Sequence, residues 1–162
     1  MTDLKWIAQA RKHIGLSEIV GPKHNSVIVA WLDSLRAWWR EDETPWCGVY
    51  VAHCIKTAGF DLPKYWMRAR DWLNWGVAIP RPVYGCVVVF ERKGGGHVGF
   101  VVGMDKRGNL MVLGGNQGNK VSIAAFDRQR VLGYRWPKGA GIPEDKPLQI
   151  VSSDGTLSTN EA

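Results

Sequence analysis

The amino-acid sequence predicts an α+β domain in which N-terminal helices pack on a C-terminal antiparallel β-sheet, a meander of about five to six strands. In the first half of the chain, apolar residues recur every three to four positions, as in amphipathic helices. From Gly85 onward the pattern changes to short runs rich in Val, Phe and Ile, separated by turn residues. With 162 residues and 45% hydrophobic content, the chain can bury one core but has no room for a second full domain.

Four helices are expected before the sheet, and their starts and ends carry recognisable signals. Asn25 or Ser26 can cap the second helix. Thr44 can cap the third, with Pro45 in the first turn, where its missing N–H costs nothing. Gly15 and Gly59 end the first and third helices. The expected ranges are 3–14, 25–40, 45–58 and 68–75.

The strands follow from residue 86 and are separated by Gly-, Asp- and Asn-containing turns. The expected ranges are 86–91, 97–104, 109–114, 120–124 and 131–136.

Charge divides the chain into a basic domain and an acidic tail. Residues 1–138 hold 20 Lys and Arg against 11 Asp and Glu, whereas residues 139–162 hold one Lys against four acids. We expect 1–138 to be a single domain and 139–162 to be flexible, since Gly, Pro, Ser and Thr dominate it. A basic surface attracts anionic partners, including nucleic acids, acidic lipids and acidic wall polymers. The sequence has no block of five like charges and no series of Lys and Arg residues alternating with aromatic residues. Nucleic-acid binding is therefore not favoured.

The targeting pattern predicts a soluble protein made in the cytosol, and we expect it to be a monomer. The N-terminal residues lack the apolar core of a secretory signal, and no run of about 18 apolar residues suggests stable membrane insertion. Three cysteines, an odd number, argue against a disulfide scaffold. Their wide spacing fits no zinc pattern, so we expect neither a metal nor another cofactor.

Cys47 is the candidate nucleophile. It falls in the first turn of the third expected helix, where unpaired backbone N–H groups and the helix dipole favour an anion and lower the pKa of a thiol. A thiolate still needs a partner that collects a proton and passes it to the leaving amine.

His97 is the candidate base. His53 lies six residues after Cys47 on the same expected helix and therefore points away from it. His13 and His24 have no obvious orienting neighbour in the sequence. His97, in contrast, opens an expected strand directly after three glycines, which allow a substrate to approach closely.

Hairpin register supplies a partner for this histidine. If Met104 and Asn109 flank the turn, paired residue numbers sum to 213, and His97 lies opposite Asn116. Side chains that face each other in this way are about 5 Å apart, so an amide oxygen can accept from an imidazole N–H. A bulge in the glycine-rich stretch after residue 113 would change this register.

Five segments in order resemble the CHAP (cysteine, histidine-dependent amidohydrolase/peptidase) and NlpC-type cell-wall peptidases, particularly a branch found in phage lysins. They are TPWCGVYVAHCIKTAG, ARDWLNWG, GCVVVFERKGGGHVGFVVG, LGGNQGNKVSI and LGYRWP. The resemblance covers roughly residues 4–137. It implies a papain-like fold, with Cys47 as nucleophile, His97 as base and Asn116 as the polar third member. It also implies that peptidoglycan is the substrate, cut at an amide within the stem peptide or at the bond joining glycan to L-alanine.

The substrate groove is less defined than the catalytic residues. Many relatives have Gln or Asp shortly before the cysteine, whereas positions 41–46 here read EDETPW. The Cys47 backbone N–H supplies one oxyanion donor, and the second is unassigned. Trp46 and Trp75 are candidates for the groove wall and Gln117 for a polar contact with substrate.

Two other functions stay open: a wall-binding domain of the same fold without turnover, and nucleic-acid binding through the basic domain. A wall enzyme without a signal peptide would reach its substrate through holin pores, as an endolysin does, or by delivery as a bacteriolytic effector.

Overall fold

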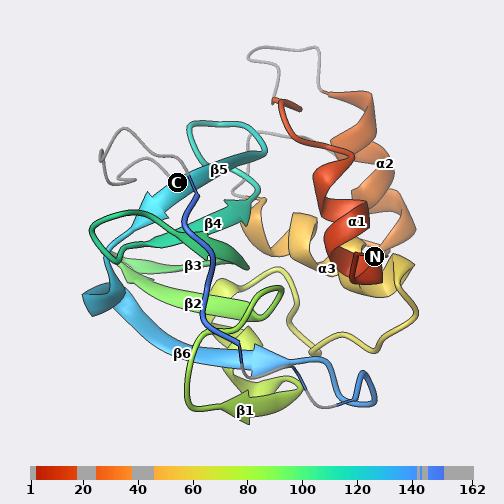
Figure 1. Cartoon of the computed structure of the whole chain (residues 1–162). Helices are drawn as coiled ribbons and strands as arrows, with labels where there is room; N and C mark the ends of the chain where they lie inside the picture. Colours follow the sequence, from red (N-terminus) through yellow and green to blue (C-terminus); the bar gives the residue numbers. More distant parts are fainter. Residues whose placement is uncertain (1–2, 18–24, 38–45, 142, 144–145, 152–162) are drawn as a thin grey trace.

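The computed structural model describes residues 3–17, 25–37, 46–141, 143 and 146–151. Helices gather on one side of a twisted antiparallel sheet, and the N-terminus lies on the helical side (Figure 1). The predicted α+β architecture is therefore confirmed.

The helical layer matches the predicted positions but is shorter. Asn25 caps the second helix, because its side chain accepts hydrogen bonds from Val27 N and Ile28 N. That helix ends at Ser34 rather than near Arg40. The third begins at Cys47, with Trp46 as its N-cap residue. The predicted Thr44 cap and Pro45 start lie outside the described residues. The segments are α1 (Lys5–Arg11), α2 (Ser26–Ser34), α3 (Cys47–Thr57) and the 3₁₀ helix η1 (Ala69–Asn74).

The sheet has six strands, in the order β1-β6-β2-β3-β4-β5. Strands β2 to β5 form the predicted meander. The last strand does not continue it, because β6 returns to pair between β1 and β2. The strands are β1 (Val77–Ile79), β2 (Val87–Arg92), β3 (Gly95–Met104), β4 (Leu110–Gly114), β5 (Ser122–Phe126) and β6 (Val131–Trp136).

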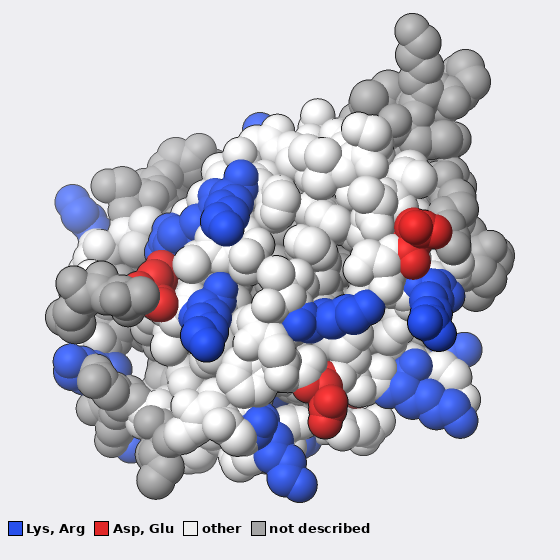
Figure 2. Space-filling view, turned by 90° about the vertical axis from the view of Figure 1, so that its right-hand side faces the viewer, with Lys and Arg blue, Asp and Glu red and all other residues white. Residues whose placement is uncertain are grey.

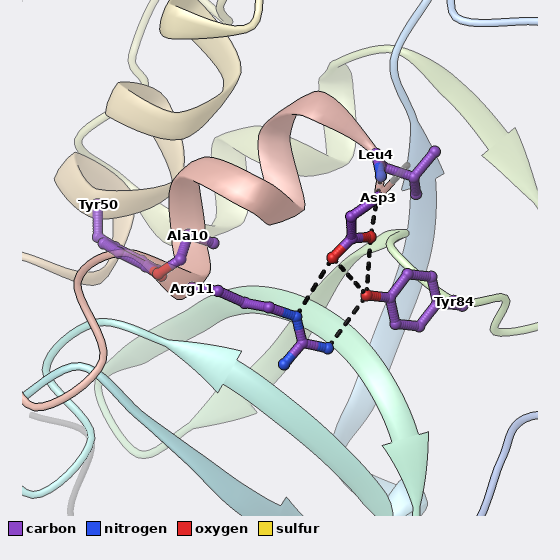
Figure 3. A network of polar contacts seen from close by, with 6 residues as sticks. All are labelled: Asp3, Leu4, Ala10, Arg11, Tyr50 and Tyr84. Atoms are coloured by element: carbon purple, nitrogen blue, oxygen red, sulfur yellow. Dashed lines mark hydrogen bonds and ion pairs between the residues drawn. The ribbon is translucent and has the colours of Figure 1, made fainter. Parts of the chain in front are cut away.

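Polar contacts fix α1 against both layers (Figure 3). Arg11 Nε lies 3.3 Å from Asp3 Oδ2, and Arg11 Nη2 donates to the Tyr84 hydroxyl at 3.0 Å. Tyr84 lies in the loop before β2. On the other side, the Tyr50 hydroxyl of α3 donates to Ala10 O at 2.6 Å. Helix α1 thus links the sheet to the helix that carries Cys47.

Helix α3 is the buried centre of the molecule. Every residue from Cys47 to Ala52 is buried. Gly48 allows the start of the helix to press against the chain before η1, since a Cβ at this position would lie 2.5 Å from Trp66 O. This close approach of Gly48 to the Trp66 backbone sets the position of the start of α3.

Part of the expected tail contacts the sheet. Met104 N donates to Gln149 O at 2.9 Å, and Val151 N donates to Met104 O at 2.7 Å. Residues 152–162 lie outside the described residues, so the flexible tail stays a prediction. Among the helices described, none combines the length and apolar character needed to cross a membrane.

Candidate active site at the start of helix α3

The tip of α3 fills a gap beside strand β3. Val101 N–H bonds to Cys86 O on the β2 side, so by alternation Val98 N–H points toward β4. Strand β4 ends at Gly114, and its last pair with β3 is Leu113 with Phe100. Val98 therefore has no β4 partner in the ladder, and its N–H instead donates to the thiol sulfur of Cys47.

The thiol of Cys47 is more buried than its helix-start position suggests. Burial raises its pKa above the ordinary thiol value. Val98 N–H, the charge of Arg92 and the N–H groups of Gly48 and Cys47 lower it, but less than burial raises it. The prediction that the helix start gives a lowered pKa is thus wrong in sign. The direction of this shift favours the neutral thiol over the thiolate.

His97 lies one residue before the N–H that binds this sulfur. It pairs with Phe90 across the β2–β3 ladder, and its side chain is fully buried. Its ring stacks on Phe126 at 5.2 Å with an interplanar angle of 6°, and the Phe90 ring is 6.3 Å away. The guanidinium of Arg130 lies over both phenylalanine rings. The imidazole is consequently held as one layer of an aromatic stack.

Gln117 fixes the tautomer of this imidazole. Its Oε1 lies 2.9 Å from His97 Nε2. Its Nε2 donates to Val112 O at 3.1 Å and to Ser122 O at 2.8 Å. Because two carbonyls occupy the amide nitrogen, the oxygen must face the imidazole, and His97 Nε2 must carry the proton. Nδ1 is then the basic nitrogen of the ring.

Gly114 makes room for this pair. A Cβ built on Gly114 would overlap Gln117 Oε1 and lie 3.3 Å from His97 Nε2. The next glycine has a separate role, since a Cβ on Gly115 would lie 2.7 Å from Tyr50 Cβ and 2.8 Å from Trp46 Cζ3. The two glycines together let the end of β4 pass between His97 and α3.

In the structure Gln117 contacts the imidazole, and the expected pairing of His97 with Asn116 is absent. The ladder stops at Gly114, before the expected pair of His97 with Asn116 can form. Asn116 has a left-handed backbone, with φ +60°, and the chain then turns so that Gln117 folds back toward β3. Asn116 is buried in this turn. Gln117 is also only 2% exposed, so a direct contact with substrate is not available to it.

The two predicted groove-wall tryptophans are core residues. Trp46 is 1% exposed and packs near Trp31, with ring centroids 6.5 Å apart. Trp75 is 6% exposed, lies edge-on to Trp72, and donates its indole N–H to Asp61 O. Neither presents a face on which a sugar could stack, because both rings are buried in the hydrophobic core.

A pocket of about 410 Å³ reaches Cys47 from the surface. It is bordered by η1 and the two residues before it, and by the β2–β3 hairpin. Its lining consists of Cys47, Met67, Arg68, Ala69, Arg70, Asp71, Arg92, Gly95 and Gly96. Three arginines and one aspartate give this pocket a positive balance.

The other cysteines do not take part in this arrangement. Cys54 and Cys86 are free, fully buried thiols, and burial raises the pKa of Cys86 to about 12. Among the described residues, no group of three or more His, Cys, Asp or Glu side chains could hold a metal ion.

Sequence reasoning missed the roles of Gln117, Arg92 and the Val98 N–H. The adjacent glycines 114 and 115 were the available signal, because they mark where β4 ends and where another group approaches the backbone closely.

No curated protein matches this chain significantly. Residues 39–116 match the family model described as CHAP domain, a segment that includes Cys47 and His97 and ends one residue before Gln117. CHAP domains are in general cysteine- and histidine-dependent hydrolases of peptidoglycan. This match confirms, over residues 39–116, the resemblance to the CHAP family that the sequence motifs indicate.

Proposed function

We propose that the chain hydrolyses an amide bond of peptidoglycan, with Cys47 as nucleophile, His97 as base and Gln117 orienting the imidazole. The observation that carries this proposal is the fixed tautomer of His97 directly beside the strand N–H that binds the Cys47 sulfur. A base held by a third polar group next to a nucleophile is the arrangement that covalent amide hydrolysis requires.

The protonation states suggest the order of the first steps. The raised pKa of Cys47 means that the resting nucleophile is a thiol, so its proton must leave as the sulfur attacks the substrate carbonyl. His97 Nδ1 takes that proton, while Nε2–H stays bonded to Gln117 Oε1. The imidazolium then donates the proton to the leaving amine, and the acyl group remains on sulfur as a thioester.

Water completes the cycle. His97 Nδ1 removes a proton from the water that attacks the thioester, and Cys47 leaves with a proton, which restores the starting state. At both tetrahedral stages the negative oxygen needs N–H donors, and the Cys47 backbone N–H at the start of α3 supplies one of them.

The bond cut is an amide of the stem peptide or the amide that joins the glycan to L-alanine. Mass spectrometry of soluble fragments distinguishes these two reactions, because the first produces new peptide termini and the second releases whole stem peptides from intact glycan.

The test is wall digestion by Cys47→Ala, with Cys54→Ala as the matched control on the same helix. We expect Cys47→Ala to release no new amino groups while its melting temperature stays close to that of the wild type. Cys54→Ala should digest walls, because its thiol lies in the core. Equal digestion by wild type and Cys47→Ala would exclude the proposed nucleophile.

A non-catalytic wall-binding domain is the alternative that this experiment separates. Wild-type protein that sediments with purified walls but releases no new amino groups in a long incubation would support binding without turnover.

A further inference from the structure

We propose that the pocket beside Cys47 binds a free carboxylate of the substrate close to the scissile amide, so that stem peptides with an acidic group are preferred over amidated ones. This inference rests on the proposed function, because it assigns specificity to the same site. Its basis is the set of guanidinium groups around the pocket.

Arg70 is held so that its terminal nitrogens remain available. Its Nε donates to Gly95 O at 2.9 Å, and its Cγ approaches Gly96 closely enough that a Cβ there would lie 3.0 Å away. The structure gives its two terminal nitrogens no hydrogen bond within the described part of the chain. Arg70 is thus anchored to the start of strand β3, two residues before His97, and its terminal N–H groups stay available.

Arg68 is positioned by an aromatic ring instead. Its guanidinium carbon lies 4.9 Å from the centre of the Tyr65 ring. This cation–π contact orients the planar group without using its N–H donors. Within the described residues, the guanidinium of Arg68 makes no hydrogen bond. The guanidinium groups of Arg68 and Arg70 therefore both border the pocket with N–H donors available to a ligand.

The electrostatic field of this pocket reaches the reaction centre. The positive charge of Arg92 acts on the Cys47 sulfur, so an anion bound among the three arginines would lie near the nucleophile. Asp71 is the single acidic group in the lining, which leaves a net charge of about +2 from the named side chains. A carboxylate can accept two charge-assisted hydrogen bonds from a planar guanidinium group. A carboxamide carries no negative charge and binds such a group more weakly.

Two carboxylates of a stem peptide could fill the pocket: the one on its glutamate residue and the one at its C-terminus. Synthetic stem peptides provide four arms, with both groups free, either one amidated, or both amidated. The arm in which amidation lowers kcat/KM identifies the carboxylate that is bound.

The variants are Arg70→Gln and Arg68→Gln, with Arg107→Gln as the control, since Arg107 is an exposed arginine in the distant β3–β4 turn. We expect each pocket variant to lower kcat/KM about tenfold for the free-carboxylate peptide and to change it little for the amidated one. Arg107→Gln should preserve the ratio between the two substrates. If both substrates are cut equally well by wild type, or all three variants lower the ratio equally, the proposal is wrong.

Binding to Cys47→Ala keeps this test separate from catalysis. We expect this variant to bind the free-carboxylate peptide more tightly than the amidated one in a calorimetric titration, with the difference shrinking as salt is added. If the wild type cuts neither peptide but this preference is found, the proposed function fails and the carboxylate site stands. If the peptides are cut without any such preference, the carboxylate site fails and the function stands.

Discussion

The side-chain amide of Gln117 is bonded at both ends, and this decides the state of the histidine. Two carbonyl oxygens accept from its nitrogen, so its oxygen can only accept from His97 Nε2. In the proposed mechanism, a tautomer set in this way leaves the other nitrogen of His97 available to Cys47 without a reorganisation step.

Replacing Gln117 should therefore impair the chemistry rather than wall binding. We expect Gln117→Leu to lower kcat at least about tenfold, because the imidazole loses its acceptor and its preferred tautomer. The matched change Asn116→Ala should leave kcat within about twofold, since Asn116 does not contact the ring. Kinetics on a soluble stem peptide, with melting curves for both variants, provides the measurement. The reverse ranking of the two variants would restore Asn116 as the third member.

The pKa of Cys47 allows a second test at the scale of one residue. Because burial raises that pKa, the thiolate fraction should keep growing as the pH rises past the ordinary thiol value near 8.5. We expect the rate of alkylation by iodoacetamide, followed at Cys47 by mass spectrometry, to increase throughout pH 6 to 9. Arg92→Gln should slow it at any given pH in that range, because the positive charge that favours the thiolate is lost. A rate already at its plateau below pH 7 would show a preformed thiolate and contradict the structure.

At the scale of elements, the pairing register of the β3–β4 hairpin was only partly predictable from the sequence. The expected register holds near the site, where Phe100 pairs with Leu113 and Val101 with Val112. Near the turn it differs by one residue, since Met104 pairs with Leu110. A bulge between Val101 and Gly103 absorbs the difference. The alternating pattern alone contains no information about where such an extra residue is inserted.

Local signals predicted the elements better than their packing. The Asn25 cap was predictable because capping depends on a few neighbouring atoms. In contrast, β1 is only three residues long, too short for a recognisable alternation. The burial of Trp46 and the end of β4 at Gly114 depend on contacts between distant segments, so neither the groove wall nor the partner of His97 could be assigned from sequence.

At the scale of the whole molecule, one face carries charge that is spread rather than gathered into a single stripe. Figure 2 shows lysine and arginine side chains over one face, with few acidic side chains among them. Such a face attracts anionic partners. The arginines of the pocket act at shorter range, because they line the same pocket as Cys47.

Helices α2 and α3 and the turn after α1 meet at two half-buried histidines, which couple the stability of the fold to pH. His53 stacks on Trp31 at 4.9 Å, and the His13 ring is 5.6 Å from His53. Burial, together with the charges of His13 and Lys56, lowers the pKa of His53 to about 4. Burial, with the charge of a neighbouring lysine, also lowers the pKa of His13. Each histidine is thus harder to protonate in the folded chain than in the unfolded one.

The free energy of unfolding should therefore be fully retained above about pH 6.5 and fall as the pH drops toward 4, because the unfolded chain takes up protons first. We expect His53→Phe, which keeps a ring against Trp31, to flatten this fall by the order of 1 kcal/mol, a modest amount since the histidine is only partly buried and water screens its charge. Urea denaturation of both proteins between pH 4 and 8 measures the effect, and carboxylates that titrate in both cancel in the difference. Parallel stability curves over this range would show that His53 is not the linked group.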